Sequence, residues 1–372
     1  MKIAMIGHKR IPSREGGIEI VVEKLVTQLI QNGHTVDVYN RRGRHVSGGG
    51  HAAGTREKYY QGARIYSIPT LSARSLNAVV YAFLASVACL FHRYDIVHYH
   101  AEGPASMLVI PHFFGKKTVV TIHGLDWQRD KWGGFATKYL MHGERIAVRY
   151  ADEIIVLTRS AQEYFRERYH RETVFIPNGL DAPVCRAPCE ITKRYGLNGG
   201  DYLLYLGRIV PEKGITYLLE AYRRLDTDVR LVIVGGGSHS GEYVSQVRQL
   251  AMEDSRVLLT GFLEGDILGE LLSNCLLYIQ PSDVEGMPLS LLEAISHNRR
   301  CLVSDIPENV ETVTNFGANY RTFPKGNIES LAEQLEQALT GGEWGSEDAS
   351  AGRGYTWDEI ARQTLDLYQN TR

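Results

Sequence analysis

The sequence contains few cysteines and carries almost no net charge. Its five cysteines in 372 residues lie mostly in apolar runs, which indicates reduced, buried thiols in a cytoplasmic protein. Cys185 and Cys189 form the only close pair, and without a second Cys or His pair nearby they make a poor zinc signature. A net charge of −2 gives no global attraction to nucleic acid. We therefore expect no bound metal, no cofactor and no nucleic-acid partner.

The sequence also lacks a hydrophobic run long enough to cross a membrane. The longest apolar run, residues 76–91, has 16 residues, whereas about 20 are needed to span a bilayer. It predicts a buried helix, with a contact to one membrane surface as the alternative. The N-terminus enters a short apolar run that ends at Gly7, and it has neither the length nor the cleavage site of a signal peptide. A cytoplasmic location is therefore expected.

The chain has the composition of a globular protein and the alternation of strands and helices that is typical of the α/β class. With 44% hydrophobic and 23% charged residues it is a globular chain, long enough for about two domains. Short β-branched runs such as KIAMIG, DIVHYH and RLVIVGGG alternate with amphipathic segments throughout. Continuous apolar strands alternating with helices predict parallel sheets covered on both faces. Helices are expected at residues 19–32, 76–93, 136–150, 216–224, 243–254 and 288–297.

The chain divides where prolines cluster and the periodicity lapses, at residues 178–191. We predict two Rossmann-like doubly wound domains facing a cleft, formed by residues 1–182 and 183–356. A last helix, within residues 357–372, is expected to cross back to the N-terminal domain. In such sheets ligands bind at the carboxyl ends of the strands, near the point where the strand order switches.

A glycine loop follows the first predicted strand. Glu15, Gly16 and Gly17 open a long helix, whose free amides and dipole favour an anion. The spacing is neither that of a GxGxxG fingerprint nor that of a P-loop, which disfavours a nicotinamide-dependent dehydrogenase. The alternative is a tight turn that uses glycine only for its backbone freedom.

A basic loop follows the first strand of the second half. Arg208 and Lys213 lie between Gly207 and Gly214, immediately before a helix. Arginine offers a planar fork to phosphate oxygens and lysine a compact charge, so the pair is suited to a diphosphate. An exposed basic turn is the alternative.

Two further polar residues stand at predicted strand ends. His123 follows VVTI and is placed to donate a hydrogen bond to a substrate or to transfer a proton. Asn178, in PNG, ends the last strand of the first half. Either residue would also suit a structural turn.

The segment PSDVEGMPLSLLEAI holds two glutamates, Glu285 in a loop and Glu293 in the following helix. Pro288 suits the first helical turn. At about 100° per residue the two carboxylates do not share one seam, so they would touch different parts of a ligand. Backbone amides at 286–289 would meet negative charge there. The alternative is that Glu285 caps the helix and Glu293 forms a salt bridge.

In their order and spacing, these motifs resemble the retaining nucleotide-sugar glycosyltransferases of family four, which have the GT-B fold. The resemblance covers essentially the whole chain through the glycine loop, TIHG, PNG, GRIVPEKG, VGGG and EGMPLSLLEA. It implies an acceptor-binding N-terminal domain and a nucleotide-sugar-binding C-terminal domain. It also implies catalytic roles for His123, Arg208, Lys213 and Glu285, and donor-binding roles for Gly16, Gly17, Asn178, Gly207, Gly286, Met287, Pro288, Leu289 and Glu293.

Within that family, the stretch MKIAMIGHKRIPSREGGIEIVVEKL is similar to bacterial rhamnosyltransferases that build surface polysaccharides. This implies dTDP-L-rhamnose as the donor and a saccharide, lipid-linked in many such pathways, as the acceptor. A UDP- or GDP-hexose transferase of the same family is the alternative. A nucleotide-sugar 2-epimerase and a silent sugar-nucleotide-binding subunit are less favoured rivals.

The chemistry expected from the resemblance is metal-independent. No Asp-x-Asp motif occurs at a useful position, so Arg208, Lys213 and helix amides would neutralise the departing diphosphate. The resemblance favours displacement on the same face of the sugar, in which a diphosphate oxygen helps to take the acceptor's proton.

A basic segment lies between Arg41 and Arg64. It holds six Arg or Lys residues and is interrupted by SGGG. Together with the apolar 76–91 helix it predicts docking on the anionic inner face of the plasma membrane. A solvated loop is the alternative.

Overall fold

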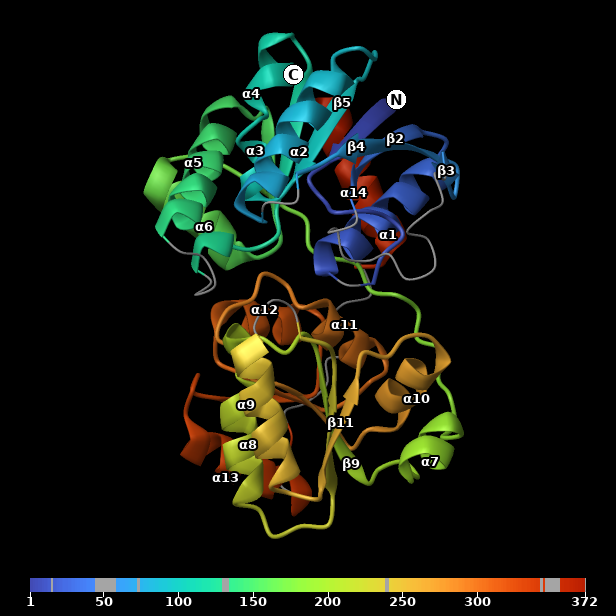
Figure 1. The fold of residues 1–372 in the computed structure, drawn as a ribbon, viewed down its shortest axis with the longest axis vertical. Helices are drawn as coiled ribbons and strands as arrows, with labels where there is room; N and C mark the ends of the chain where they lie inside the picture. The colour runs from blue at the N-terminus through green and yellow to red at the C-terminus, as the bar shows by residue number, and fades with distance from the viewer. Residues whose placement is uncertain are drawn as a thin grey trace. The chain divides into compact units, whose positions relative to one another are not determined.

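The computed structural model describes residues 1–14, 16–43, 58–71, 74–128, 134–237, 241–341, 344 and 355–371. The chain folds into two compact units (Figure 1). The N-terminal unit comprises Met1–Gly179 and Thr356–Arg372, and the C-terminal unit comprises Leu180–Tyr355. The last helix is therefore part of the N-terminal unit.

The N-terminal unit is built on an eight-stranded sheet with the order β3-β4-β2-β1-β5-β6-β7-β8. All neighbours are parallel except the short β3, which runs antiparallel to β4. The strands are β1 (Lys2–Ile6), β2 (Thr35–Arg42), β3 (Tyr59–Tyr60), β4 (Ala63–Pro69), β5 (Ile96–His100), β6 (Lys117–Ile122), β7 (Glu153–Val156) and β8 (Val174–Phe175). The strand order switches at β1, because β2 and β4 lie on one side of it and β5 to β8 on the other.

Helices cover both faces of this sheet. One core cluster packs side chains of α2, α3, α5 and α6 against the sheet, and α1 packs against α14. The bounds are α1 (Gly17–Gln31), α2 (Arg74–Cys89), α3 (Glu102–Ala105), α4 (Val109–Phe113), η1 (Asp126–Gln128), α5 (Gly134–Tyr150), α6 (Arg159–Tyr169) and α14 (Trp357–Asn370). Buried strands of this kind, with apolar side chains on both faces, explain why the sequence shows continuous apolar runs.

The C-terminal unit is a six-stranded, wholly parallel sheet with the order β11-β10-β9-β12-β13-β14. Its strands are β9 (Tyr202–Leu206), β10 (Arg230–Val234), β11 (Val257–Gly261), β12 (Leu277–Gln280), β13 (Cys301–Ser304) and β14 (Tyr320–Phe323). The order switches at β9, so β9 and β12 are neighbours although two strands separate them in the chain. This is the strand order of a doubly wound sheet.

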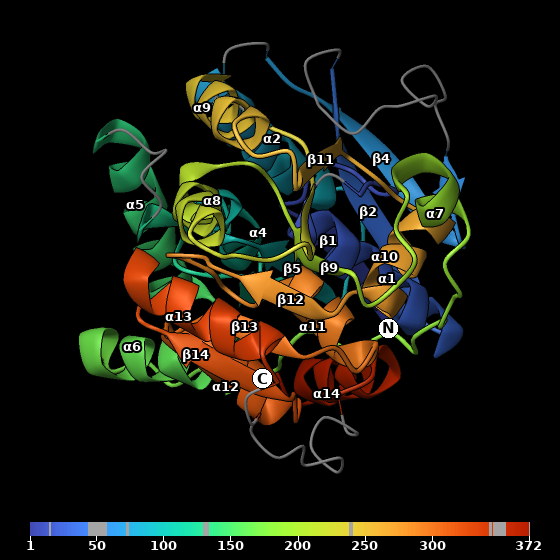
Figure 2. The same cartoon turned by 90° about the horizontal axis from the view of Figure 1, so that it is seen from below.

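Successive residues of each buried strand point to opposite faces, and so each face has its own core. Leu203 and Tyr205 face one cluster, whereas Tyr202 and Leu204 face the other. Figure 2 shows α8, α9 and α13 on one side of the sheet and α7, α10, α11 and α12 on the other. These helices are α7 (Glu190–Tyr195), α8 (Ile215–Arg223), α9 (Gly241–Met252), α10 (Asp266–Asn274), α11 (Leu289–Ser296), α12 (Pro307–Asn315) and α13 (Ile328–Leu339), with the short η2 (Pro211–Lys213) before α8.

Two details differ from the sequence prediction. Pro288 is not in the first helical turn: it is the N-cap of α11, with ψ at 114° in the extended region, and Leu289 is the first helical residue. The apolar helix predicted to reach residue 93 ends at Cys89. Of the five cysteines, Cys89, Cys275 and Cys301 are buried, and Cys185 and Cys189 are exposed free thiols.

Candidate functional site

The carboxyl ends of β9 and β12 carry most of the residues predicted to bind a donor. The loop after β9 runs through Gly207, Arg208 and Lys213, and the loop after β12 runs through Glu285 to Pro288. Because these strands are neighbours at the switch in strand order, their loops lie at the point where parallel α/β sheets bind ligands.

Glycine allows the two loops to touch. Gly214 has φ at +66°, and a Cβ placed on it would lie 2.1 Å from the carbonyl oxygen of Pro281. The backbone carbonyl of Gly207 lies still closer to Gly235, where an added Cβ would be 1.7 Å from it. A side chain at either position would push the strand-end loops apart.

Lys213 and Glu285 form an ion pair between the two loops. The Lys213 Nζ atom donates to Glu285 Oε1, and only 13% and 6% of the respective side chains are exposed. Gln280 Nε2 donates to the same carboxylate oxygen at 2.6 Å. The cation predicted to hold a diphosphate and the carboxylate predicted to touch the sugar thus bind each other in this structure.

A network of buried polar side chains at the end of β12 holds Gln280 in place to bind Glu285. The Tyr278 hydroxyl donates to Gln280 Oε1 at 2.7 Å, and Gln280 Nε2 also donates to Ser282 Oγ at 2.8 Å. Gln280, Ser282 and Tyr278 are buried. None of the three is among the residues predicted from the sequence, although polar residues at the end of a buried strand and just after it, in YIQPS, were a usable signal.

Arg208 lies in the same surroundings. Its carbonyl accepts a hydrogen bond from the Tyr205 hydroxyl at 3.1 Å, and its side chain is half-buried. Burial raises the pKa of Tyr205 well above its usual value, the charge of Glu285 raises it further, and the charge of Arg208 lowers it. Both charges therefore act on the same buried phenol.

The helix α11 begins beside this loop. The backbone N–H groups of Leu291 and Leu292 donate to the Pro288 carbonyl at 3.2 Å, which fixes the first turn. Gly286 and Met287 are buried ahead of it, and Glu293 is half-buried in the middle of the helix. The first turn thus presents the positive end of a helix dipole next to the Lys213–Glu285 pair.

A third carboxyl group was missed by the sequence analysis. Glu308, in the first turn of α12, is half-buried, and its pKa is raised by burial and further by the charges of Glu311 and Glu285. It follows β13 in SDIPEN, which is a strand-end acidic residue of the kind that marked Glu285.

In the N-terminal unit, His123 belongs to a chain of histidines at the switch in strand order. Its Nε2 atom is 3.0 Å from Nδ1 of His100, so one ring donates and the other accepts. The His98 ring stacks on His100 with centroids 4.3 Å apart, and its nitrogens bond Tyr368 and Thr121 at 2.6 and 2.7 Å. Burial lowers the pKa of His98 to about 3, and it lowers that of His100 well below its usual value. Both rings are therefore neutral near pH 7.

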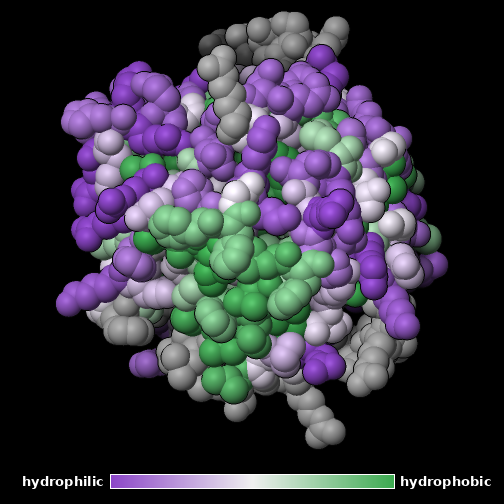
Figure 3. Space-filling view, turned by 90° about the horizontal axis from the view of Figure 1, so that it is seen from above, coloured by the Kyte–Doolittle hydropathy of each residue, from purple (hydrophilic) through white to green (hydrophobic). Residues whose placement is uncertain are grey.

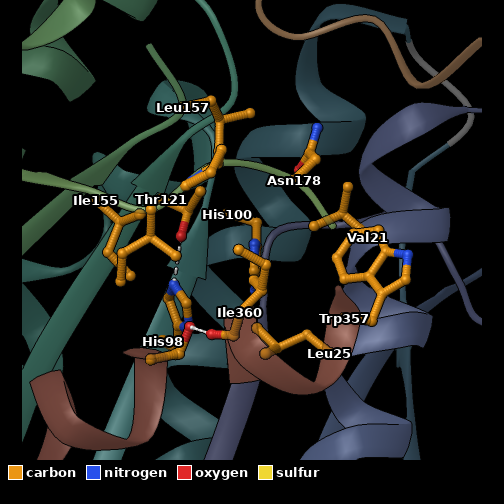
Figure 4. Close-up of a pocket in the computed structure, with 13 residues that line it drawn as sticks. Val21, Leu25, His98, His100, Thr121, Ile155, Leu157, Asn178, Trp357 and Ile360 are labelled. Atoms are coloured by element: carbon orange, nitrogen blue, oxygen red, sulfur yellow. Dashed lines mark hydrogen bonds between the residues drawn. The ribbon is translucent and has the colours of Figure 1, made fainter. Parts of the chain in front are cut away.

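Asn178 lines a small cavity with these histidines. The cavity lies between β5 to β7, the segment after β8 and the helices α1 and α14, with His98, His100 and Trp357 in its wall (Figure 4). Asn178 is only 2% exposed, and the next residue, Gly179, approaches Trp357 so closely that an added Cβ would lie 2.7 Å away. Asn178 is thus fixed in the N-terminal unit by α14.

The predicted glycine loop starts α1. Gly16 is the N-cap and Gly17 the first helical residue, and Glu15 lies outside the described residues. The Glu19 carboxylate folds over Gly16, where an added Cβ would lie 2.1 Å from Oε2, and it accepts a hydrogen bond from the Lys9 N–H at 2.9 Å. A negative charge of the protein itself therefore stands at this helix start.

The predicted residues are divided between the two units. The N-terminal unit holds Gly16, Gly17, His123 and Asn178, and the C-terminal unit holds Gly207, Arg208, Lys213, Glu285, Gly286, Met287, Pro288, Leu289 and Glu293.

In the described part of the chain, no group of three or more His, Cys, Asp or Glu side chains is arranged to hold a metal ion. Within the same residues, no helix has the length and apolarity to cross a membrane.

Comparisons with known proteins agree with this architecture. Residues 15–182 match the family model described as Glycosyltransferase Family 4, and residues 190–351 match the one described as Glycosyl transferases group 1. The chain is 27% identical to the alpha-maltose-1-phosphate synthase of Mycolicibacterium smegmatis over 99% of both chains.

Solved structures are similar over nearly the full chain. Sucrose-phosphate synthase from Thermosynechococcus elongatus superposes with a TM-score of 0.82 at 19% identity, covering 99% of this chain and 98% of that one. Anabaena HepE in complex with UDP-glucose superposes with a TM-score of 0.76 at 19% identity, covering 99% of each chain. The names of these relatives differ in the sugar that they mention, and so they indicate the class of enzyme and not its donor. The chain belongs to the glycosyltransferases of the group 1 and family 4 type, with two Rossmann-like α/β units in the GT-B fold.

Proposed function

We propose that the enzyme transfers a sugar, with retention of configuration and without a metal ion, from a nucleoside diphosphate donor to a saccharide acceptor. The observation that carries this proposal is the Lys213–Glu285 ion pair beside the switch in strand order. It holds a cation suited to phosphate next to a carboxylate suited to sugar hydroxyls. In this proposal the C-terminal unit binds the nucleotide sugar and the N-terminal unit binds the acceptor.

The donor diphosphate takes the place of Glu285 as the partner of Lys213. Negative charge grows on the departing diphosphate, and Lys213, Arg208 and the amides at 286–289 stabilise it. Glu285, released from Lys213 but still held by Gln280, contacts the donor sugar. Glu293 binds the ribose hydroxyls, and the bare backbone at Gly207 admits the nucleotide.

Retention follows from displacement on one face of the sugar. A diphosphate oxygen takes the proton of the attacking acceptor hydroxyl while the bond to the sugar breaks. The strength of the diphosphate contacts then matters more than any carboxylate base. For the N-terminal unit, the resemblance assigns His123 a hydrogen bond to the reacting sugar, and it assigns donor binding to Gly16, Gly17 and Asn178.

Two donor classes are proposed in order. The N-terminal sequence supports dTDP-L-rhamnose, and the likeness to HepE, a structure in complex with UDP-glucose, supports a UDP-hexose. A ligand that binds only the folded protein raises its melting temperature by mass action. We expect one of these two donors to raise it in a thermal-shift screen that also includes the GDP-hexoses, which are the further alternative.

The acceptor is proposed to be a saccharide, lipid-linked, in bacterial surface polysaccharide synthesis. The proposed location is cytoplasmic, at the inner face of the plasma membrane. Of the basic segment between Arg41 and Arg64 that suggested this, residues 44–57 lie outside the described residues.

Turnover with and without EDTA tests the proposal. Product should form at the same rate in both cases, because protein cations and amides neutralise the diphosphate. Loss of activity in EDTA, restored by Mn²⁺ or Mg²⁺, would refute metal independence. Incubation of the donor alone should return it unchanged, whereas formation of a 2-epimer would assign the protein to the isomerases.

A further inference from the structure

The N-terminal unit exposes an apolar surface formed by α2 and α4. Phe83, Phe91, Phe113 and Phe114 are exposed by 47, 82, 72 and 70%. Figure 3 shows a continuous apolar area on the end of the molecule at which α4 lies in Figure 1. Exposed patches of this kind on a globular protein mark interaction sites. We call it the α2–α4 apolar face.

The face follows the helical repeat of both segments. Phe83 and half-buried Val87 lie four residues apart on one side of α2, and half-buried Leu90 and exposed Phe91 follow in the turn after the helix ends at Cys89. In the second segment Ile110 precedes Phe113 and Phe114 by three and four residues, and α4 packs against α2. The Phe113 ring also contacts Tyr150 at the end of α5, with centroids 5.7 Å apart.

The charged residues at the edge of this face are mainly cationic. No Asp or Glu occurs in residues 75–92 or 103–115. A cation follows each of the two segments. Exposed Arg93 comes after α2, and Lys116 comes after α4, with its Nζ donating to the His92 carbonyl at 3.0 Å. The nearby Asp95 accepts a hydrogen bond from the Lys2 N–H at 2.6 Å. The surface therefore has an apolar centre and a mainly cationic edge.

We propose that the α2–α4 apolar face inserts into an anionic phospholipid bilayer. Protruding phenylalanines enter the acyl boundary while the cations at the edge meet the headgroups. A second copy of the chain suits this surface less well, because an isologous contact would bring equal cations together. This inference deepens the proposed function by naming the surface that holds the enzyme at the membrane.

The position of the face shows that it anchors the enzyme and does not bind the acceptor. Phe91 precedes β5 and Phe114 precedes β6, so both lie at the amino edge of the sheet. His100 and His123 lie at the carboxyl ends of the same strands. A five-residue strand such as β5 spans about 17 Å, and so membrane contact leaves the candidate site free.

The described part of the predicted basic segment reaches the same helix at a different place. Arg41 lies over the Tyr81 ring of α2, 4.8 Å from its centroid, at the carboxyl end of β2, whereas the exposed phenylalanines lie toward the C-terminal end of α2.

Flotation with phosphatidylcholine vesicles, with and without phosphatidylglycerol, tests the proposal. The full chain should bind the anionic vesicles, and high salt should weaken but not abolish binding. Phe91→Ser/Phe113→Ser/Phe114→Ser should lower the partition coefficient about tenfold or more. Arg93→Glu should lower it about fivefold or more.

A matched control is available in the C-terminal unit. Met252 and Phe262 are exposed by 80 and 53%, and Met252→Ser/Phe262→Ser should bind vesicles like the wild type. Binding of the triple variant at wild-type strength, or no binding of the wild type to either vesicle, overturns the proposal. If the wild type forms dimers and the triple variant is monomeric, the face is a contact between two copies of the chain, which overturns the proposal.

Turnover on a soluble acceptor separates this inference from the proposed function. It should equal the wild-type value in Phe91→Ser/Phe113→Ser/Phe114→Ser and in Arg93→Glu, because these substitutions lie at the opposite edge of the sheet from His100 and His123. If the protein binds vesicles but shows no turnover, the proposed transferase function is refuted and the proposed membrane surface is supported.

Discussion

At the scale of single residues, the Lys213–Glu285 pair determines how substitutions in the site act. Each partner is nearly buried, so each depends on the other to offset the loss of its hydration. A variant of one partner therefore alters both donor binding and the free energy of unfolding. Activity alone cannot separate these effects.

Lys213→Ala should destabilise the C-terminal unit by about 3 kcal/mol or more, because it leaves a buried carboxylate without its cation. Lys213→Met/Glu285→Gln should recover most of that loss, because the Gln280 hydrogen bond remains and no charge is stranded. Both variants should lose most turnover. Urea denaturation together with product formation measures the two effects.

The surface pair Arg223–Glu253 in the same unit is the matched control, with 44 and 46% of its side chains exposed. Arg223→Ala should cost under about 1 kcal/mol and leave turnover unchanged. Equal costs for Lys213→Ala and Arg223→Ala would show that burial does not strengthen the pair at the site.

At the scale of elements, two turns with the same backbone angle differ in their surroundings. Gly214 between η2 and α8 has φ at +66° and contacts Pro281, whereas Gly196 at the end of α7 has φ at +67° and no atom within 4 Å of an added Cβ. The two glycines therefore separate conformational strain from close approach.

Gly196→Ala should cost about 1 kcal/mol, which is the strain of a left-handed residue. Gly214→Ala should cost at least about 2 kcal/mol more and should weaken donor binding, because it forces the loops after β9 and β12 apart. Thermal unfolding and a donor titration check both variants. If both variants lose the same stability, the close approach of Gly214 to the Pro281 carbonyl adds no free-energy cost beyond the backbone strain.

The helix α11 illustrates how far element prediction reaches. The motif EGMPLSLLEA places a helix start at Pro288 to within one residue, because proline suits both the N-cap and the first turn. The sequence does not show that Gln280, at the end of β12, donates a hydrogen bond to Glu285 ahead of this helix, a contact that ties the loop before α11 to the strand.

At the scale of the whole molecule, buried histidines are concentrated in the N-terminal unit. Burial lowers the pKa of His8 to about 4 and that of His98 to about 3, and it also depresses that of His100. His297, the histidine described in the C-terminal unit, is half-buried. The two units should therefore respond differently to acid.

Below pH 6.5 the unfolded chain binds protons on these histidines while the folded N-terminal unit does not. Stability is thus fully present above pH 6.5 and decreases as the pH falls toward about 4, by about 1.4 kcal/mol per pH unit for each histidine. Calorimetry between pH 7 and about 5 should show the transition of the N-terminal unit moving more than that of the C-terminal unit.

His98→Gln should lessen this pH dependence by about one proton, because an amide retains hydrogen-bonding groups but does not titrate. An unchanged slope in this variant would show that His98 does not contribute to the acid response.

The α/β class, the two Rossmann-like halves and the order of the glycosyltransferase motifs can all be predicted from local features of the sequence, because apolar periodicity and strand-end loops are local. The folded structure was needed to show that Lys213 binds Glu285, that His100 binds His123, and that exposed phenylalanines at the ends of α2 and α4 form one surface. Each of these contacts joins segments separated in the chain, and the spacing of residues along a sequence carries no distance between strands that become neighbours only when the sheet forms.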